Sequence, residues 1–238
     1  MARSVTIYIE DNASSYFFSH EQGWTLSFGK VSKPEPIEEY TTVPGRTTGA
    51  LDMSTALTDG EVLYNNRTLE IVLENSNGTR AERYAKYRAL VSAYAGKKCR
   101  VTLPDYPDYF VTGRLKFSLE THDLAHTIVR ITATVEPWFY SVGGASIPYQ
   151  VSQSAFTTRN YNNEGDMTLR PYSVEVVQPG GSGTVTIAAV DDSWTYTLGV
   201  GSYIIPELVA PPGDNAIFKH KGALAVRLHF KYAKAILE

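Results

Sequence analysis

Two histidines in the segment HDLAH, His122 and His126, have a spacing that could serve chemistry. On a helix, residues four apart lie on one face, which is how zinc proteases present a pair of imidazole ligands. Those enzymes also place a glutamate directly after the first histidine, whereas Asp123 follows His122 here. The alternating segment after His126 predicts a turn leading into a strand, and such a turn does not bring the rings together as a helix does. We therefore favour a turn over a metal site.

Two pairs of aspartates could supply the carboxyl groups of a hydrolase or of a calcium site. Asp105 and Asp108 flank a proline, and Asp191 and Asp192 are adjacent in a hairpin loop. A glycosidase needs two carboxyl groups across a cleft, one of them with a raised pKa, and calcium needs more oxygen ligands. Aspartates in turns usually accept hydrogen bonds from the turn backbone. We interpret both pairs as turn residues.

The other motif candidates also point away from catalysis. Cys99 is the only cysteine, which excludes an intramolecular disulfide and a four-cysteine zinc site, and its strand-like context predicts a buried thiol. The segment GKKCR lacks the glycine spacing of a phosphate-binding loop, and PGRTTGA lacks its strand–turn–helix context. The sequence thus favours a protein that is not an enzyme and that uses neither a cofactor nor a metal.

Two aromatic residues in the segment SWTYTL, Trp194 and Tyr196, could stack on a sugar ring. Their spacing places both on the same face of a strand as Leu198. An aromatic stripe of this kind fills a core more often than it binds a ligand. We retain the pair as a candidate sugar-stacking site, with core packing as the favoured alternative.

Composition and charge narrow the function classes. The chain has 238 residues, of which 43% are hydrophobic and 20% charged, so a packed core is expected. The net charge of −3 and the absence of a long basic run argue against a nucleic-acid-binding domain. No apolar run reaches the length of a membrane span, and the N-terminus begins directly with a strand pattern. We expect synthesis in a cytosol and no membrane anchoring.

Strict alternation of apolar and polar residues dominates the first half of the chain. The apolar residues of each segment share one face, and they are Val5, Ile7 and Ile9; Leu69, Ile71 and Leu73; Leu115, Phe117 and Leu119; and Val129, Ile131, Ala133 and Val135. A period of two with one polar face is typical of antiparallel strands that bury one side. Residues 97–120 predict a long hairpin whose turn carries Pro104 and Pro107.

One segment, residues 79–96, breaks the alternation and predicts a helix. Thr79 and Glu82 form a capping box at its start, and Gly96 follows its last apolar residue. The residues at spacings of three and four predict an apolar stripe that packs on a sheet, and they are Tyr84, Tyr87, Leu90, Val91 and Tyr94. A basic face with Arg80, Arg83 and Lys86 predicts a solvated surface or a subunit contact.

The composition changes near residue 141, where Gly, Ser, Asn and Gln become frequent. Short alternating segments follow, separated by turn residues at the spacing of a β-sandwich. We therefore predict two domains, residues 1–140 and 141–238, of which the second is a β-sandwich without a helix.

A long loop and the strand after it carry a set of motif residues, which are Pro44, Gly45, Arg46, Gly49, Leu51 and Asp52 in the loop, and Asn66 and Arg67 in the strand. In the second half the corresponding residues are Asn163, Gly165, Pro171, Gly213 and Asn215. These residues and the order of the segments resemble the distal tail protein of long-tailed, non-contractile bacteriophages, a family with a loop of the kind PGR-G-LD before a strand with an NR element. The resemblance spans most of the chain, and the order of the elements supports it more strongly than any single motif.

This resemblance implies a mainly β architecture and an assembly role. The N-terminal domain would be a tail-tube-like β-sandwich with one α-helix and a long hairpin, and the C-terminal domain a β-sandwich like that of galectins or carbohydrate-binding modules. The implied protein is a homohexameric hub at the distal end of the virion tail, assembled in the host cytoplasm. Its implied partners are the tail tube protein, the tape measure protein and a tail-tip or receptor-binding protein, with DNA only passing through the lumen.

The resemblance also implies where to look for contacts. Candidate interface or lumen residues are Pro44, Gly45, Arg46, Asn66 and Arg67. For Arg46 the alternative is that it caps a carbonyl or carboxylate group within its own subunit. An alternative function for the chain is a glycan-binding sandwich that attaches to the host surface.

Overall fold

The computed structural model describes residues 4–10, 12–41, 51–54, 62–149, 155–178 and 183–238. Its internal contacts divide the chain into two compact units, residues 1–139 together with 238, and residues 140–237. Of the helices formed by the described residues, none has the length and hydrophobicity needed to span a bilayer.

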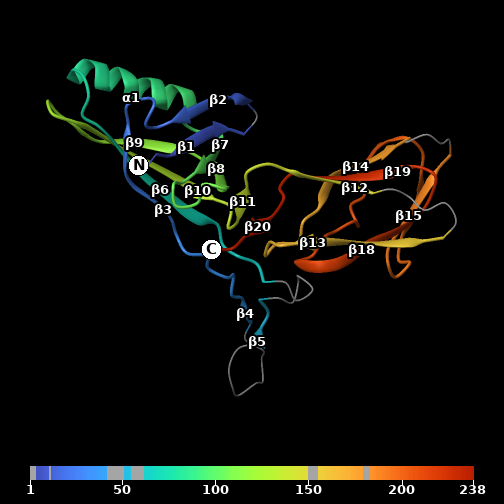
Figure 1. Ribbon diagram of the computed structural model, residues 1–238. Helices are drawn as coiled ribbons and strands as arrows, with labels where there is room; N and C mark the ends of the chain where they lie inside the picture. Colours follow the sequence, from blue (N-terminus) through green and yellow to red (C-terminus); the bar gives the residue numbers. More distant parts are fainter. Residues whose placement is uncertain (1–3, 11, 42–50, 55–61, 150–154, 179–182) are drawn as a thin grey trace. The chain divides into compact units, whose positions relative to one another are not determined.

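In its described residues, the first unit consists of strands and the helix α1 (Figure 1). Its elements are β1 (Thr6–Ile9), β2 (Asn12–Phe18), β3 (Thr25–Val31), β4 (Tyr40–Thr41), β5 (Leu51–Asp52), β6 (Arg67–Asn75), α1 (Arg80–Tyr94), β7 (Lys98–Thr102), β8 (Tyr109–Arg114), β9 (Lys116–His122) and β10 (Thr127–Val135). The sheet order is β2-β1-β7-β8-β10-β6-β3, with β9 paired to β10, while β4 and β5 pair separately. The hydrogen bonds join these strands, apart from β4 and β5, into one sheet. The sandwich layout that the resemblance implies for this unit stays a prediction.

The centre of this sheet follows from the predicted alternation. β6 and β10 pair over their whole length, with Ile71 opposite Ile131. Every second side chain of both strands is buried, so one face of the pair is apolar throughout. This face supplies most of the core of the first unit.

Helix α1 begins and ends where the sequence predicts. Thr79 is its N-cap, and the capping box with Glu82 is present in both directions. Gly96 follows the last turn with a φ of +72°, a left-handed conformation that favours glycine. Leu90 and Tyr94 of the predicted apolar stripe are buried, and the Tyr94 ring lies 6.2 Å from that of Phe17 on β2.

The second unit consists of two four-stranded antiparallel sheets, ordered β12-β19-β14-β17 and β13-β18-β15-β16. The strands of these two sheets are β12 (Ala145–Tyr149), β13 (Thr157–Asn163), β14 (Pro171–Val177), β15 (Val185–Ala188), β16 (Thr195–Leu198), β17 (Gly201–Tyr203), β18 (Gly213–Gly222) and β19 (Ala225–Phe230). Two further short strands, β11 (Phe139–Ser141) and β20 (Ala235–Ile236), belong to neither of them and pair with each other. One apolar cluster takes residues from both sheets, including Val176 and Leu228 from one and Ile187 and Phe218 from the other. The sheets therefore pack face to face over a shared core.

Candidate functional site

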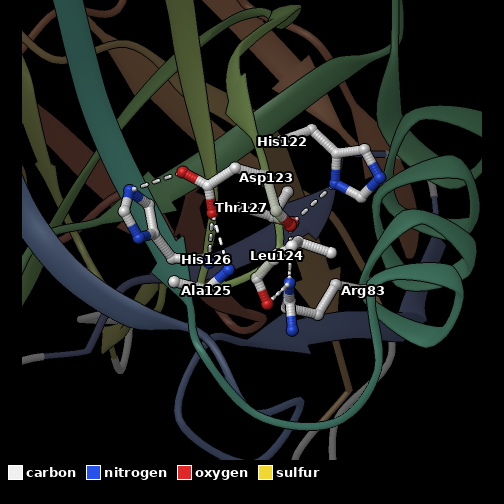
Figure 2. Close-up of polar contacts among 7 residues, drawn as sticks. All are labelled: Arg83, His122, Asp123, Leu124, Ala125, His126 and Thr127. Atoms are coloured by element: carbon white, nitrogen blue, oxygen red, sulfur yellow. Dashed lines mark hydrogen bonds and ion pairs between the residues drawn. The ribbon is translucent and has the colours of Figure 1, made fainter.

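The turn between β9 and β10 is held by a buried arginine, as Figure 2 shows. The Arg83 side chain extends from α1 and is 1% exposed. Its Nη2 donates to the carbonyl oxygens of Asp123 (2.8 Å) and Leu124 (3.0 Å), and its Nη1 donates to Gly78 (2.6 Å). Its Nε donates to the Thr127 hydroxyl at 3.3 Å. The predicted solvated position of Arg83 is therefore wrong, because carbonyl groups distant in sequence satisfy its charge.

The two histidines of HDLAH lie on opposite sides of this turn (Figure 2). His122 Nδ1 lies 2.8 Å from the Thr127 hydroxyl, whereas His126 Nε2 lies 3.6 Å from Asp123 Oδ2. Asp123 Oδ1 accepts hydrogen bonds from the amides of Ala125 and His126, and these bonds lower the pKa of Asp123. Within the described ranges, no group of three or more His, Cys, Asp or Glu side chains is placed to hold a metal ion. These contacts hold the backbone of the turn in place. Leu124 lies at its tip and is 85% exposed.

Arg67, at the start of β6, is the second buried arginine of the first unit. Its guanidinium donates to the carbonyl oxygens of Ser32 (2.5 Å), Pro137 (3.1 Å) and Glu238 (2.5 Å), and it lies 4.9 Å from the centre of the Phe139 ring. Burial lowers the pKa of Arg67, although a guanidinium stays charged. All these contacts lie within the first unit, so Arg67 links segments of this unit through their carbonyl groups. We call an arginine that does this, such as Arg67 or Arg83, a clamp.

The other predicted interface residues are placed as follows. Pro44, Gly45 and Arg46 lie outside the described residues. Asn66 is exposed directly before β6. Their roles at an interface or in a lumen stay predictions.

The predicted sugar-stacking pair lies on β16 and just before it. The ring centres of Trp194 and Tyr196 are 5.8 Å apart, and both side chains are half-buried against the core of the second unit. The Tyr196 hydroxyl donates to Glu207 Oε2 at 3.1 Å, which raises the pKa of Tyr196. This packing agrees with the favoured alternative, in which the two rings pack against the core. Binding of a sugar by the pair stays a prediction.

Comparison with solved structures identifies the fold. The Dit protein of phage SPP1 aligns with 95% of this chain over 98% of its own length, at a TM-score of 0.64 and 11% identity. The two chains share one fold. That Dit protein is described as a paradigm of the hub adsorption apparatus in phages that infect Gram-positive bacteria. Two structures of the phage P2 baseplate in its activated conformation, with Ca and with Sr, align over 98% of this chain and 100% of theirs at TM-scores of 0.43 and 0.46, both at 8% identity. No protein-family model and no curated protein sequence matches.

Proposed function

We propose that this chain is the distal tail hub of a phage with a long non-contractile tail. In this role it forms a homohexameric ring that joins the tail tube to the tail-tip or receptor-binding apparatus. The observation that carries the proposal is the shared fold with the Dit protein of SPP1 over nearly the whole of both chains.

The open sheet of the first unit supports assembly into a ring. β2 and β3 end its strand order, and among the described strands each pairs with only one neighbour. Each also exposes an aromatic side chain, Tyr16 on β2 and Phe28 on β3. Unpaired strand edges are sites where another chain can add. A ring of identical subunits needs two different, complementary patches on each copy, and two opposite edges supply them.

Labelling of intact virions tests the position of the hub. Gold-conjugated antibodies raised against the purified chain should mark the distal end of the tail in electron micrographs. Label on the head or along the tail shaft would overturn the proposal. Intact virions treated with the same antibodies after adsorption on the purified chain provide the control for antibody specificity.

Native mass spectrometry of the purified chain tests the ring. We expect a hexamer, and a monomer at micromolar concentration would contradict it. If Arg46 contributes to the interface, Arg46→Ala should lower the hexamer fraction. Arg88→Ala, which removes an exposed arginine from α1, should leave that fraction unchanged. Equal hexamer fractions in the two variants would show that Arg46 does not contribute to the interface. That result would leave the proposal of a hexameric ring unchanged.

A further inference from the structure

One sheet of the second unit carries a connected set of polar side chains on its outer face. In β14 and β19, Val174, Val176 and Leu228 point into the core, so the residues between them point outward. Glu175 on β14 pairs in register with Arg227 on β19. An acidic and a basic side chain are therefore neighbours at the centre of this outer face.

Glu175 links two neighbours on β19. Its Oε2 accepts a hydrogen bond from Arg227 Nη1 at 3.2 Å and lies 3.1 Å from His229 Nε2. A carboxylate only accepts hydrogen bonds, so His229 Nε2 must carry the hydrogen. The bond from His229, followed by the charge of Arg227, lowers the pKa of Glu175. The three side chains are thus held in one arrangement while 37%, 43% and 24% of Glu175, Arg227 and His229 remain open to solvent.

A β-bulge adds an aromatic ring to this set. The register of β14 against β19 shifts between Pro171 and Ser173, so Tyr172 is the extra residue. A bulge redirects the side chain at its extra position. The Tyr172 ring lies 6.1 Å from the His229 ring and is 59% exposed. Tyr172 therefore borders the polar set and is largely open to solvent.

Tyr172 also lines a groove that lies wholly within the second unit. The groove has a volume of about 370 Å³, and its other lining residues include Met167, Arg170 and Tyr232. The Arg170 side chain is held by a hydrogen bond from its Nη1 to the Pro206 carbonyl oxygen at 2.7 Å. The groove is largely apolar, and Tyr172 is the residue that it shares with the polar set.

We infer that Tyr172, Glu175, Arg227 and His229 form a binding site for a neutral saccharide. A pyranose ring has an apolar C–H face, which suits the Tyr172 ring, and a rim of hydroxyl groups that both donate and accept. Glu175 accepts hydrogen bonds, and Arg227 has N–H donors beyond the one bonded to Glu175. The carboxylate at the centre offsets the arginine, so an acidic ligand is not favoured. This site is distinct from Trp194 and Tyr196, and it operates whether or not the chain forms a ring.

Saturation-transfer NMR on the full-length chain tests the site. The probes are methyl pyranosides of glucose, galactose, mannose, rhamnose and N-acetylglucosamine. We expect at least one of them to bind with a dissociation constant in the millimolar range. Tyr172→Ala and Glu175→Gln should each weaken that binding by about tenfold or more, because each removes one of the two kinds of contact.

Two matched variants separate this site from other exposed aromatics. Tyr16→Ala removes an exposed tyrosine from the first unit, and Trp194→Ala removes the sequence-predicted stacking residue. Both should bind the sugar like the unsubstituted chain. Absence of binding by every probe up to about 20 mM, or undiminished binding by both Tyr172→Ala and Glu175→Gln, would overturn the inference. Loss of binding in Trp194→Ala alone would also overturn it and would place the site at Trp194, just before β16.

Discussion

Replacing Arg83 with methionine should release the turn between β9 and β10. Methionine keeps most of the aliphatic stem but removes every donor that reaches the turn. The carbonyl groups of Gly78, Asp123 and Leu124 would then lose charged hydrogen bonds that are only partly shielded from solvent, since all three residues are exposed. Water can reach these acceptors, so the cost is that of the lost charged hydrogen bonds without the added penalty of a fully buried unpaired acceptor.

The size of the effect follows from the number and kind of these bonds. A hydrogen bond to a charged group contributes about 1.5–3 kcal/mol, and bonds made by one side chain do not add fully. We therefore expect Arg83→Met to lower the free energy of opening the turn by about 3–4 kcal/mol. That is a large part of the roughly 5–15 kcal/mol that stabilises a typical domain. Arg88→Met, an exposed position on the same helix, should change it by less than about 0.5 kcal/mol.

Hydrogen exchange measured by mass spectrometry reads this opening locally, which matters because a chain of two units need not unfold in one step. The amides of Ala125 and His126 are the probes, since both donate to Asp123 Oδ1. Exchange of the segment 122–127 should speed up by roughly 100-fold or more in Arg83→Met, given tenfold per 1.4 kcal/mol. Equal exchange rates in the Arg83→Met and Arg88→Met variants would refute the clamp.

Three further predictions concern the first unit. Arg67→Met should lower the free energy of unfolding of this unit by about 2–4 kcal/mol, measured by urea denaturation; unchanged denaturation would contradict this. Burial raises the pKa of Cys99 to about 11, so iodoacetamide at pH 8 should alkylate it roughly 100-fold more slowly than a free cysteine until the unit unfolds. Thr79→Ala should cost about 1 kcal/mol at pH 7 through loss of the helix cap. Hydrogen bonds from Thr79 lower the pKa of Glu82 in the folded chain. The stabilisation that Glu82 contributes through these bonds is therefore complete above the pKa of Glu82 in the unfolded chain, and it is lost as the pH falls through the pKa in the folded chain. The cost of Thr79→Ala should therefore be smaller at about pH 3 than at pH 7.

The regular elements could be predicted because their signals are local. In β6 and β10 the alternation of apolar residues matches the observed burial position by position. The capping box at Thr79 and the glycine at 96 fix both ends of α1 within one residue. These patterns depend on the nearest neighbours along the chain, which a sequence displays directly.

The clamps could not be predicted because their partners are backbone carbonyl groups far along the chain. Arg67 reaches Glu238 across 171 positions, and Arg83 reaches Leu124 across 41. Any residue supplies a carbonyl oxygen, so no residue type marks these partners. The usual rule that arginine is exposed then gives the wrong position for Arg83. The bulge at Tyr172 also has no local signal, since it arises from the register against β19.

Two of the motif residues that suggested the family have a steric or hydrogen-bonding reason in this fold. A Cβ on Gly165 would lie 2.4 Å from the Ala235 carbonyl oxygen, so only glycine fits there. The Asn163 side chain is buried and donates to the carbonyl oxygens of Met167 (2.8 Å) and Ala210 (2.9 Å). The motif therefore identifies how the second unit is built, and it does not by itself identify a contact with another chain.

The groups to which Arg67, Arg83 and Arg227 donate distinguish the arginines that stabilise the fold from the one that we place in a binding site. Arg67 and Arg83 are buried, and each donates to three backbone carbonyl groups, so a substitution there changes stability first. Arg227 is 43% exposed and bonds a carboxylate that is itself exposed, which leaves donors that a ligand can use. If this distinction holds, Arg227→Lys should weaken saccharide binding without altering the unfolding of the second unit, because a lysine keeps the charge but lacks the planar set of donors.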